Sequence, residues 1–414
     1  MALTQIKTNA IADDAITEDK ILNDAVTAAK IPANAIGASE LADNAVDTAA
    51  IADDAVTQAK VNVSINRKLI INGAMTVAQR GTTSTASDYG TVDRFKLVHA
   101  GTDEAPTQEQ VDVASGTTPY TLGFRKAFKI TNGNQTSGAG ASDNTLVRYK
   151  VEAQDIANSG WNYLSSSSNI TLSFWVKSSV AQNFYGNLIA PDGTDSYNYA
   201  IETGSLTAIT WTKITKTISG NSNLTFNNDI GVGLQMDLWA FAGTTYTDSG
   251  VTLNQWSVFS SGGRMPDNTS TWYTTNDATF EVTGFQLEVG STASPFNHET
   301  YAETLRKCQR YLYVLDLGTV TNIIQLPMHR LNVSTGAPQH YINWPVVMRD
   351  APTMSKEGTS LSWTGYQSNI SLGAVLPSGG CVVGDTATAS GDSSWHRVNN
   401  TSGSTLRYLF KAEL

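Results

Sequence analysis

Residues 6–61 read IKTNAIADDAITEDKILNDAVTAAKIPANAIGASELADNAVDTAAIADDAVTQAKV. In this stretch a branched aliphatic residue recurs at every fifth position. These positions are Ile6, Ile11, Ile16, Ile21, Val26, Ile31, Ile36, Leu41, Val46, Ile51, Val56 and Val61. Small and polar residues lie between them, including the acidic pairs Asp13-Asp14 and Asp53-Asp54. A period held this strictly is typical of a repeated structural unit.

The five-residue period fits neither one helix stripe nor one strand face. Five residues on an α-helix advance by about 500°, so successive aliphatic residues lie about 140° apart. On a strand, an odd step alternates between the two faces. The Asp and Asn pairs favour turns, because their side chains bond nearby backbone groups. Each unit is therefore a pair of short extended pieces around a turn.

A single unit of this kind cannot bury its own aliphatic side chain. Neighbouring units must stack, or several chains must wind together. We predict a fibrous stalk over residues 1–65 in a homotrimer; a monomeric solenoid of short repeats is the alternative. The predicted trimer core of the stalk consists of Ile11, Ile16, Ile21, Val26, Ile31, Ile36, Leu41, Val46, Ile51 and Val56.

Composition narrows the class of protein and its partners. Charged residues make up only 15% of the 414 residues, which favours a β-rich structural protein over a typical soluble enzyme. The formal net charge of −10 argues against nucleic acid and anionic membranes as partners. Residues 1–60 hold ten Asp and Glu against four Lys. An acidic rod of this kind stays soluble and resists side-to-side association.

The cysteines and the first residues indicate where the chain folds. Cys308 and Cys381 form neither a disulfide framework nor a metal-binding spacing, so we expect two free thiols in a reducing cytosol. Residues 1–6 lack the apolar run of a signal peptide, and no stretch approaches about 18 consecutive apolar residues. We therefore expect synthesis in a cytoplasm, no membrane insertion and no ordinary secretion.

Beyond the stalk, short alternating segments predict strands. The first aromatic residue of the chain is Tyr89. Leu172, Phe174 and Val176 alternate with more polar neighbours, and residues 212–218 and 280–287 alternate as well. Clusters of Gly, Asn, Asp and Ser separate these segments. We predict a mostly β fold, with a jelly-roll-like β-sandwich over residues 66–298.

One helix is predicted by its N-terminal signature. Thr300 and Glu303 have the spacing of a capping box, and Leu305, Cys308 and Leu312 then share a face with Tyr301. We predict a linking helix over residues 299–314 and a C-terminal β-sandwich over residues 315–414. The alternation that ends at residues 406–412 indicates a last strand within a sheet.

Several stretches resemble known sequences in the order in which they occur here. The repeat IADDAVTQAK at residues 51–60 resembles repeats at the start of many bacteriophage tail fibres. LIINGAMTVAQRG at residues 69–81 and TVDRF at 91–95 resemble the opening of a fibre module common in phages. Its closing signature resembles FQLEVGS at 285–291, PF at 295–296 and CQRY at 308–311. WPVVMRDAP at 344–352 and AEL at 412–414 resemble the C-terminal module that usually follows.

The resemblance implies a phage fibre subunit. Such a subunit is trimeric, is attached to other virion proteins through its N-terminal region, and presents β domains to the host. The central module is similar in its strand pattern to carbohydrate-binding jelly rolls. The family supplies no agreed catalytic residues. This sequence lacks the long N-terminal adaptor domain of some short-tailed phage fibres, which leaves tail, baseplate and capsid open as mounting sites.

Catalytic and metal-binding motifs are absent from the sequence. The five histidines, His99, His298, His329, His340 and His396, have no partner at metal spacing, so we expect surface or structural roles for them. Asp192 and Asp195 flank a turn-like Gly193. A turn role is favoured there over a calcium ligand, and a calcium ligand over a catalytic carboxylate. We expect no catalytic residues, no metal and no cofactor.

Aromatic residues are the best candidates for ligand contacts, because Trp and Tyr rings can cover the apolar face of a sugar. Trp175, Trp211 and Trp256 lie within strand patterns and are expected in the core. The candidate glycan-binding residues lie instead among Gly, Ser, Thr and Asn, although partial burial of any single one is favoured. These candidates are Tyr197, Tyr199, Tyr246, Trp272, Tyr273, Trp363, Tyr366 and Trp395.

Together these features predict a structural fibre on the tail or outer surface of a phage virion. We expect it to mediate attachment to the host cell through a surface glycan, without enzymatic activity. One alternative is an architectural fibre or capsid decoration that binds no receptor. Another is a capsule depolymerase; such enzymes usually need a long parallel β-helix, and no repeat of that kind follows residue 65.

Overall fold

The computed structural model describes residues 69–316, 343–357 and 407–414, together with Thr27, Lys30 and Ile31. It also describes the backbone of short segments at residues 324–327, 339–342, 361–362, 370–377, 380–385 and 395–400. The chain divides into two compact units, Met1–Val63 and Ser64–Leu414. The predicted domain boundaries inside the second unit stay predictions.

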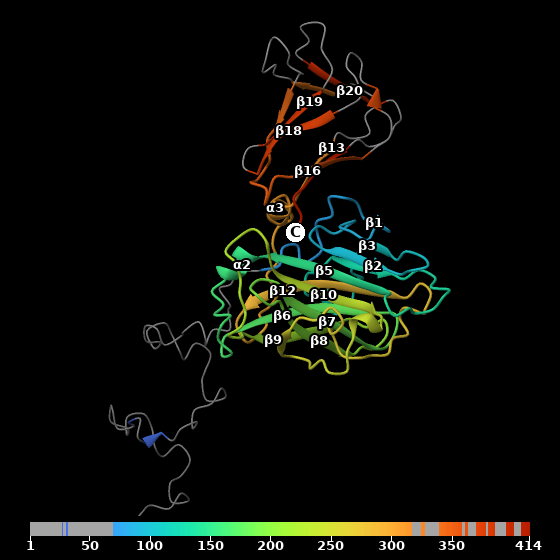
Figure 1. Cartoon of the computed structure of the whole chain (residues 1–414), viewed down its shortest axis with the longest axis vertical. Helices are drawn as coiled ribbons and strands as arrows, with labels where there is room; N and C mark the ends of the chain where they lie inside the picture. The colour runs from blue at the N-terminus through green and yellow to red at the C-terminus, as the bar shows by residue number, and fades with distance from the viewer. Residues whose placement is uncertain are drawn as a thin grey trace, which may run out of the picture. The chain divides into compact units, whose positions relative to one another are not determined.

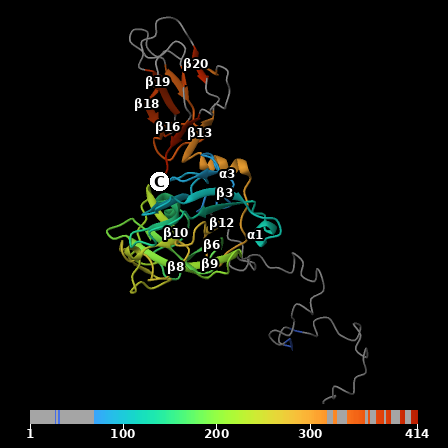
Figure 2. The same cartoon turned by 90° about the vertical axis from the view of Figure 1, so that its right-hand side faces the viewer.

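Residues 69–298 form a sandwich of two antiparallel sheets, each with six strands among the described residues. The first sheet has the order β1-β3-β4-β12-β6-β9, and the second has the order β11-β8-β7-β10-β5-β2. Figure 1 shows β5, β10, β7 and β8 in sequence across the second sheet, and Figure 2 shows β3, β12, β6 and β9 of the first. The prediction of a mostly β, jelly-roll-like sandwich is confirmed.

The strand bounds follow the alternation of the sequence. In the first sheet they are β1 Thr83–Ser84, β3 Thr107–Asp112, β4 Lys126–Thr131, β12 Thr279–Val289, β6 Asn169–Ser178 and β9 Thr212–Ser219. In the second they are β11 Trp256–Val258, β8 Tyr197–Ser205, β7 Asn183–Ala190, β10 Val232–Ala242, β5 Asn144–Glu152 and β2 Lys96–Ala100. Short helices α1 (Thr118–Thr121) and α2 (Ala153–Ala157) join strands. The predicted strands at residues 172–176, 212–218 and 280–287 are confirmed.

The core of the sandwich lies between the two sheets. Phe174 of β6 and Phe285 of β12 stack with ring centroids 4.8 Å apart. From the facing side, Phe95 lies 5.4 Å from Phe285 and 4.9 Å from Tyr149 of β5. Alternate residues of both sheets point into this layer, so apolar burial holds the sheets together.

The predicted capping box is present at the start of α3 (Tyr301–Cys308). The Thr300 hydroxyl accepts from the Glu303 backbone N–H, and the Glu303 carboxylate accepts from the Thr300 N–H at 3.0 Å. The helix packs its Cys308 face inward, and burial raises the pKa of the Cys308 thiol. The predicted extension of this helix to residue 314 is wrong: α3 ends at Cys308, and Leu312 already lies in β13.

The C-terminal region has three three-stranded antiparallel sheets among its described residues. The first joins β13 (Leu312–Asp316), β21 (Arg407–Lys411) and β16 (Thr353–Glu357). The others join β14 (Ile324–Pro327), β20 (Trp395–Asn400) and β17 (Leu361–Ser362), and β15 (Gln339–Ile342), β19 (Gly380–Asp385) and β18 (Ile370–Leu376). The predicted last strand is confirmed, and it is the central strand of its sheet.

A buried ionic cluster, here called the C-terminal anchor, joins the end of this region to the sandwich. The Glu413 carboxylate accepts from Arg80 and Arg94, each at 2.9 Å. The Arg94 side chain is only 1% exposed, and its guanidinium lies 3.4 Å from the centroid of the Tyr311 ring. Arg94 also donates to the Lys150 carbonyl at 2.6 Å. A desolvated cation of this kind needs both its carboxylate and its aromatic neighbours.

A second buried carboxylate strengthens the same junction. Glu152 ends β5 and accepts from Arg310 at 2.7 and 2.8 Å and from the Tyr311 hydroxyl at 2.5 Å. Burial opposes ionisation of Glu152, but these hydrogen bonds outweigh it and lower its pKa. Residues 308–311, the CQRY segment, therefore hold the helix end against the sandwich.

Asp93 next to the anchor should give stability a pH dependence. Burial raises its pKa to about 6, although Gln79 donates to both of its carboxylate oxygens. The folded state binds this proton more tightly than the unfolded state, so the contribution to stability is complete below about pH 4 and is lost as the pH rises through about 6. The thermal midpoint of the wild type minus that of Asp93→Asn should therefore fall as the pH is raised from about 4 to about 7.

The exposed Asp112 supplies the control for this measurement, through Asp112→Asn. Its thermal midpoint should stay close to that of the wild type, because an exposed ion pair contributes at most about 1 kcal/mol to stability. A difference for Asp93→Asn that stays constant with pH would contradict the assignment.

Candidate functional site

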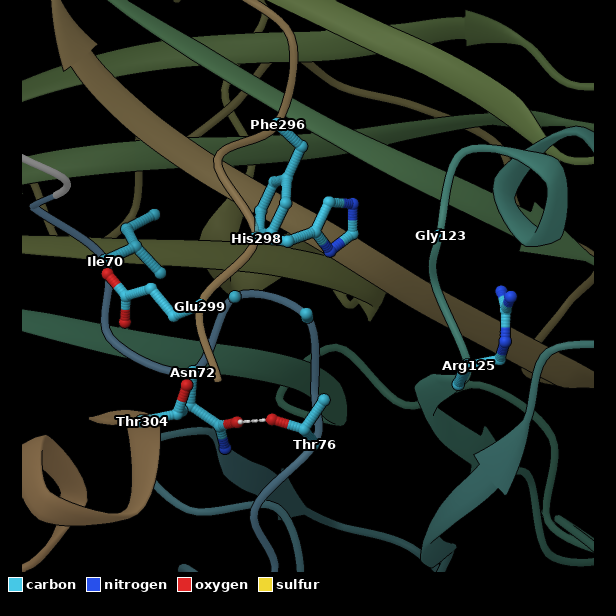
Figure 3. A pocket seen from close by; sticks show the side chains of 11 residues that line it. Ile70, Asn72, Thr76, Gly123, Arg125, Phe296, His298, Glu299 and Thr304 are labelled. Atoms are coloured by element: carbon cyan, nitrogen blue, oxygen red, sulfur yellow. Dashed lines mark hydrogen bonds between the residues drawn. The ribbon is translucent and has the colours of Figure 1, made fainter. Parts of the chain in front are cut away.

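A cavity of about 300 Å³ opens where three segments of the sandwich meet. These segments are the loop at residues 70–76, the turn at 123–125 that precedes β4, and residues 296–304, which comprise an irregular segment and the first turn of α3. Figure 3 shows the Phe296 and His298 rings side by side, with Glu299 toward one side of the cavity and Arg125 toward the other. The cavity therefore offers an aromatic wall between two charged groups of opposite sign.

The aromatic wall is held by close packing. The Phe296 ring centroid lies 4.8 Å from both Phe124 and His298, and the Phe124 and His298 centroids are 5.0 Å apart. His298 Nε2 is 2.8 Å from the Leu122 carbonyl oxygen, which fixes the imidazole plane. Gly123 has φ +98°, and a Cβ there would lie 3.0 Å from His298 Nε2. Glycine is thus required for the turn to approach the ring.

The polar groups of the cavity differ in how much hydrogen-bonding capacity they retain. Asn72 is used internally, since its amide donates to the Val77 and Asp93 carbonyls. Thr304 donates to the Thr300 carbonyl. Among the described residues, the Thr76 hydroxyl makes a single, long hydrogen bond, 3.4 Å to the Asn72 side-chain oxygen. Its hydroxyl is therefore available to a ligand.

The two charged residues of the cavity are positioned by neighbours. Glu299 accepts from Lys307 at 2.7 Å. Arg125 stacks its guanidinium 3.9 Å from the Tyr120 ring centroid, and its Nη1 donates to the Tyr120 and Phe124 carbonyls. Both side chains remain partly accessible. They can hydrogen-bond hydroxyl groups as an acceptor and a donor, respectively.

Next to the cavity, partly exposed aromatic residues gather on the outer face of the first sheet. This aromatic surface consists of Tyr120, Trp175, Trp211 and Phe296, which pack over buried Val113, Phe124 and Ala127. Lys177 lies 5.0 Å above the Trp211 ring. Rigid, flat, half-exposed rings beside a polar cavity suit contact with the apolar faces of sugar rings.

The expectation that Trp175 and Trp211 lie in the core is corrected by this placement. In β6, Trp175 shares its phase with Ser173 and Lys177 rather than with the buried Phe174 and Val176. The period-two pattern therefore placed Trp175 on the outer face. Trp256 is partly buried, packs against the main core and donates to the Ser219 carbonyl at 2.8 Å.

Three of the predicted glycan contacts lie inside the sandwich instead. Trp272 and Tyr273 are completely buried, and Trp272 donates its indole N–H to the Thr279 carbonyl. Tyr199 is also buried and packs against Trp256. These rings fill the core, because their polar atoms find internal partners, so they are not available to a ligand. Trp272 lies among Ser, Thr and Asn, a composition typical of an exposed loop, and the prediction of a ligand contact followed from that composition.

The other predicted contacts in the sandwich do not join the cavity. Tyr197 is partly buried and packs against the main core. Tyr246 belongs to a separate cluster with Trp239 on the second sheet, and its hydroxyl donates to the Ser142 carbonyl. The structure therefore does not bring the five predicted aromatic residues of the sandwich together into one surface.

The remaining predicted residues are not tested. Trp363 and Tyr366 lie outside the described residues, as do Ile11, Ile16, Ile21, Val26, Ile36, Leu41, Val46, Ile51 and Val56. Trp395 lies in β20, of which the backbone alone is described. Ile31 is 42% exposed in the single chain. The trimer core of the stalk stays a prediction.

Other candidate chemistries find little support among the described residues. Asp192 accepts from the backbone and side-chain N–H groups of Asn227 at 2.9 and 3.2 Å, which ties its loop to the segment before β10, and its role in a local turn stays a prediction. Burial raises its pKa. Within the described ranges there is no group of three or more His, Cys, Asp and Glu side chains suited to hold a metal ion. None of the described helices is long and apolar enough to cross a membrane.

Sequence reasoning missed Phe296, His298, Arg125 and Thr76 as site residues. The phage-fibre resemblance includes Phe296 only as part of its closing signature, and we expected a surface or structural role for His298. Arg125 and Thr76 come from segments about 170 to 220 residues away from them. A signal was available in the PFNHE stretch at residues 295–299, where two ring side chains alternate with polar residues outside any strand pattern.

Comparison with known proteins identifies no family for this chain. No protein-family model matches the sequence, and no curated protein matches it. Among solved structures, an enzymatically active domain of tailspike protein 4 from bacteriophage CBA120 is similar over 54% of this chain and 21% of its own, at 8% identity and a TM-score of 0.28. The alignment thus spans about a fifth of that tailspike chain.

Two carbohydrate-binding modules are also among the similar structures. A xylan-binding domain from Paenibacillus barcinonensis matches over 50% of this chain and 100% of its own, at 15% identity and a TM-score of 0.26. A family 11 module from Clostridium thermocellum, in complex with a mixed-linked tetrasaccharide, matches over 51% and 98%, at 11% identity and a TM-score of 0.24. Similarities this weak carry no argument about function.

Proposed function

We propose that this chain is a glycan-binding subunit of a phage virion fibre that attaches the particle to the host cell surface. The observation that carries the proposal is the aromatic surface beside the cavity with Arg125, His298 and Glu299. The resemblance of residues 51–95 and 285–352 to phage fibre modules supplies the biological setting. The N-terminal region would mount the subunit on other virion proteins as a homotrimer.

Attachment of this kind needs binding and no bond-breaking chemistry. A sugar ring can stack on Trp175 or Trp211, while Thr76, Arg125 and Glu299 bond the hydroxyls of a residue in the cavity. A single site of this kind with a millimolar Kd contributes about 4 kcal/mol. Three copies in one fibre would raise the effective concentration and turn weak contacts into firm adsorption.

The aromatic surface can be tested by replacing two of its rings. The double variant Trp175→Ala, Trp211→Ala should bind host envelopes about 30-fold more weakly, because a sugar ring stacks on one of the two rings and one such Trp contact contributes about 2 kcal/mol. Binding is measured by co-sedimentation of the purified full chain with envelopes. The control is Trp256→Ala, which loses a partly buried Trp from the other sheet. Equal binding by the double variant and the wild type would overturn the assignment.

The same assay separates the two alternatives. An architectural fibre or capsid decoration should show no binding by the wild-type chain to envelopes of any strain that the phage infects. A capsule depolymerase should lower the viscosity of host polysaccharide during incubation. Retained viscosity together with saturable binding is the result expected here.

A further inference from the structure

The outer face of the second sheet carries a row of polar side chains across four strands. Lys96 of β2 is in register with Arg148 of β5, Arg148 with Asp237 of β10, and Asp237 with Asn187 of β7. Their neighbours along each strand point into the core. This face is on the opposite side of the sandwich from the aromatic surface, because the two belong to the outer faces of different sheets.

Hydrogen bonds fix the centre of the row. Arg148 donates to Asp237 through Nε at 2.7 Å and Nη2 at 2.8 Å, and Gln235 donates to the same carboxylate at 3.0 Å. Asn187 donates to Asn198 and accepts from the Trp239 indole, both at 2.8 Å. Arg148 therefore keeps a fixed orientation. Its Nη1 has no hydrogen-bond partner within the described part of the chain.

Lys150 supplies a third cation on this face, beside Lys96 and Arg148. It lies two residues after Arg148 in β5, and so on the same face, and is in register with Gln235. Among the described residues Lys150 forms no ion pair, whereas Lys96 is paired with Asp88 at 3.1 Å. Burial lowers the pKa of Lys150, and the nearby charges of Arg148 and Lys96 lower it further. The row of side chains together with Lys150 is here called the strip. It carries an uncompensated positive charge in a chain whose net charge is −10.

We propose that this strip is a second binding site, specific for a carboxylate-bearing polysaccharide such as a polyuronate. The ammonium of Lys150 and the free Nη1 of Arg148 are the donors for one carboxylate of the polymer. The amide of Gln235, which is in register with Lys150 on the neighbouring strand and partly exposed, is placed to contact the adjoining sugar.

The chemistry of the strip favours an acidic polymer over a neutral one. A lysine crowded by cations is unfavourable without a counter-charge, and a bound carboxylate supplies it. A neutral sugar could use the same donors but would leave that repulsion in place. The acidic stalk and the net charge of −10 would repel an acidic polymer elsewhere on the chain, so binding should be confined to this face.

The test compares polygalacturonate with dextran, a neutral polymer, by isothermal titration calorimetry on the full chain. The wild type should bind polygalacturonate, bind dextran at least tenfold more weakly, and lose affinity when salt is raised from about 0.15 to about 0.5 M. Lys150→Gln should weaken polygalacturonate binding about tenfold through the loss of one charge-assisted hydrogen bond. Lys150→Arg should restore most of the affinity.

The control is Lys213→Gln, which removes an exposed lysine from β9 of the other sheet. Among the described residues Lys150 pairs with no carboxylate, so Lys150→Gln leaves no acidic group without its partner. The variant should therefore fold with an unchanged thermal midpoint. Absence of polygalacturonate binding by the wild type would overturn the proposal, as would equal weakening by Lys213→Gln. Loss of envelope binding in the Trp175 and Trp211 variant with polygalacturonate binding intact would show that the two sites are separate.

Discussion

Glu413→Ala should lower the free energy of unfolding by about 3–5 kcal/mol, the usual cost of removing one partner of a buried ion pair. The change leaves Arg94 and Arg80, whose side chains are 1% and 7% exposed, without their shared carboxylate. The Tyr311 ring would remain against Arg94 but cannot replace a full negative charge. The measurement is the thermal midpoint and the urea midpoint of the full chain.

The matched control for this prediction is Asp112→Ala. Asp112 is also a carboxylate paired with a cation, Lys126, but its side chain is 81% exposed. Exposed pairs of this kind contribute at most about 1 kcal/mol, so its midpoints should stay close to those of the wild type. If both variants lost the same small amount of stability, the C-terminal anchor would have no special role.

Gly73→Ala should be comparably damaging, with a loss of more than about 3 kcal/mol. A Cβ at Gly73 would lie 1.9 Å from the Phe285 carbonyl oxygen, which is backbone and cannot rotate away. The loop at residues 70–76 would have to move off β12, breaking the hydrogen bond from the Phe285 N–H to the Gly73 carbonyl at 3.0 Å. Because this loop also lines the cavity, envelope binding should fall as well.

Gly262→Ala provides the comparison for Gly73→Ala. A Cβ there would meet its nearest atom, the Thr245 carbonyl oxygen, at 3.6 Å, which is ordinary van der Waals contact. Its stability should stay within about 0.5 kcal/mol of the wild type. A tolerated alanine at position 73 would mean that the loop is not held against β12 as described.

Strands and helix starts that depend on neighbouring residues were predicted correctly from the sequence. Alternation over residues 172–176 and 212–218 identified β6 and β9, and the spacing of Thr300 and Glu303 identified the start of α3. These features depend on residues a few positions apart. They are therefore visible in the sequence without knowledge of the fold.

The candidate site was less accessible to sequence reasoning, because its residues meet only through tertiary contacts. Trp272 lies in a polar stretch yet is completely buried, whereas Trp175 lies in a strand yet is partly exposed. Which side of a sheet becomes buried depends on what packs against it. Arg125 and His298 come to line the same cavity only after β4 and the segment before α3 have been placed.

The stretches that resemble phage fibre modules contribute residues to the same buried junction. Asn72, Asp93 and Arg94 come from the opening signature, Arg310 and Tyr311 from the closing one, and Glu413 from the last module. They all take part in the buried hydrogen bonds around the C-terminal anchor. Their residue types are explained by this junction rather than by ligand contact.

The long sequence separation within the anchor also bears on how the protein is made. Ribosomes add about 5–20 residues per second, so Glu413 emerges roughly 15 to 60 s after Arg94. Until then two guanidinium groups destined for the interior have no carboxylate to neutralise them. The C-terminal anchor can therefore form only after residue 413 has been synthesised.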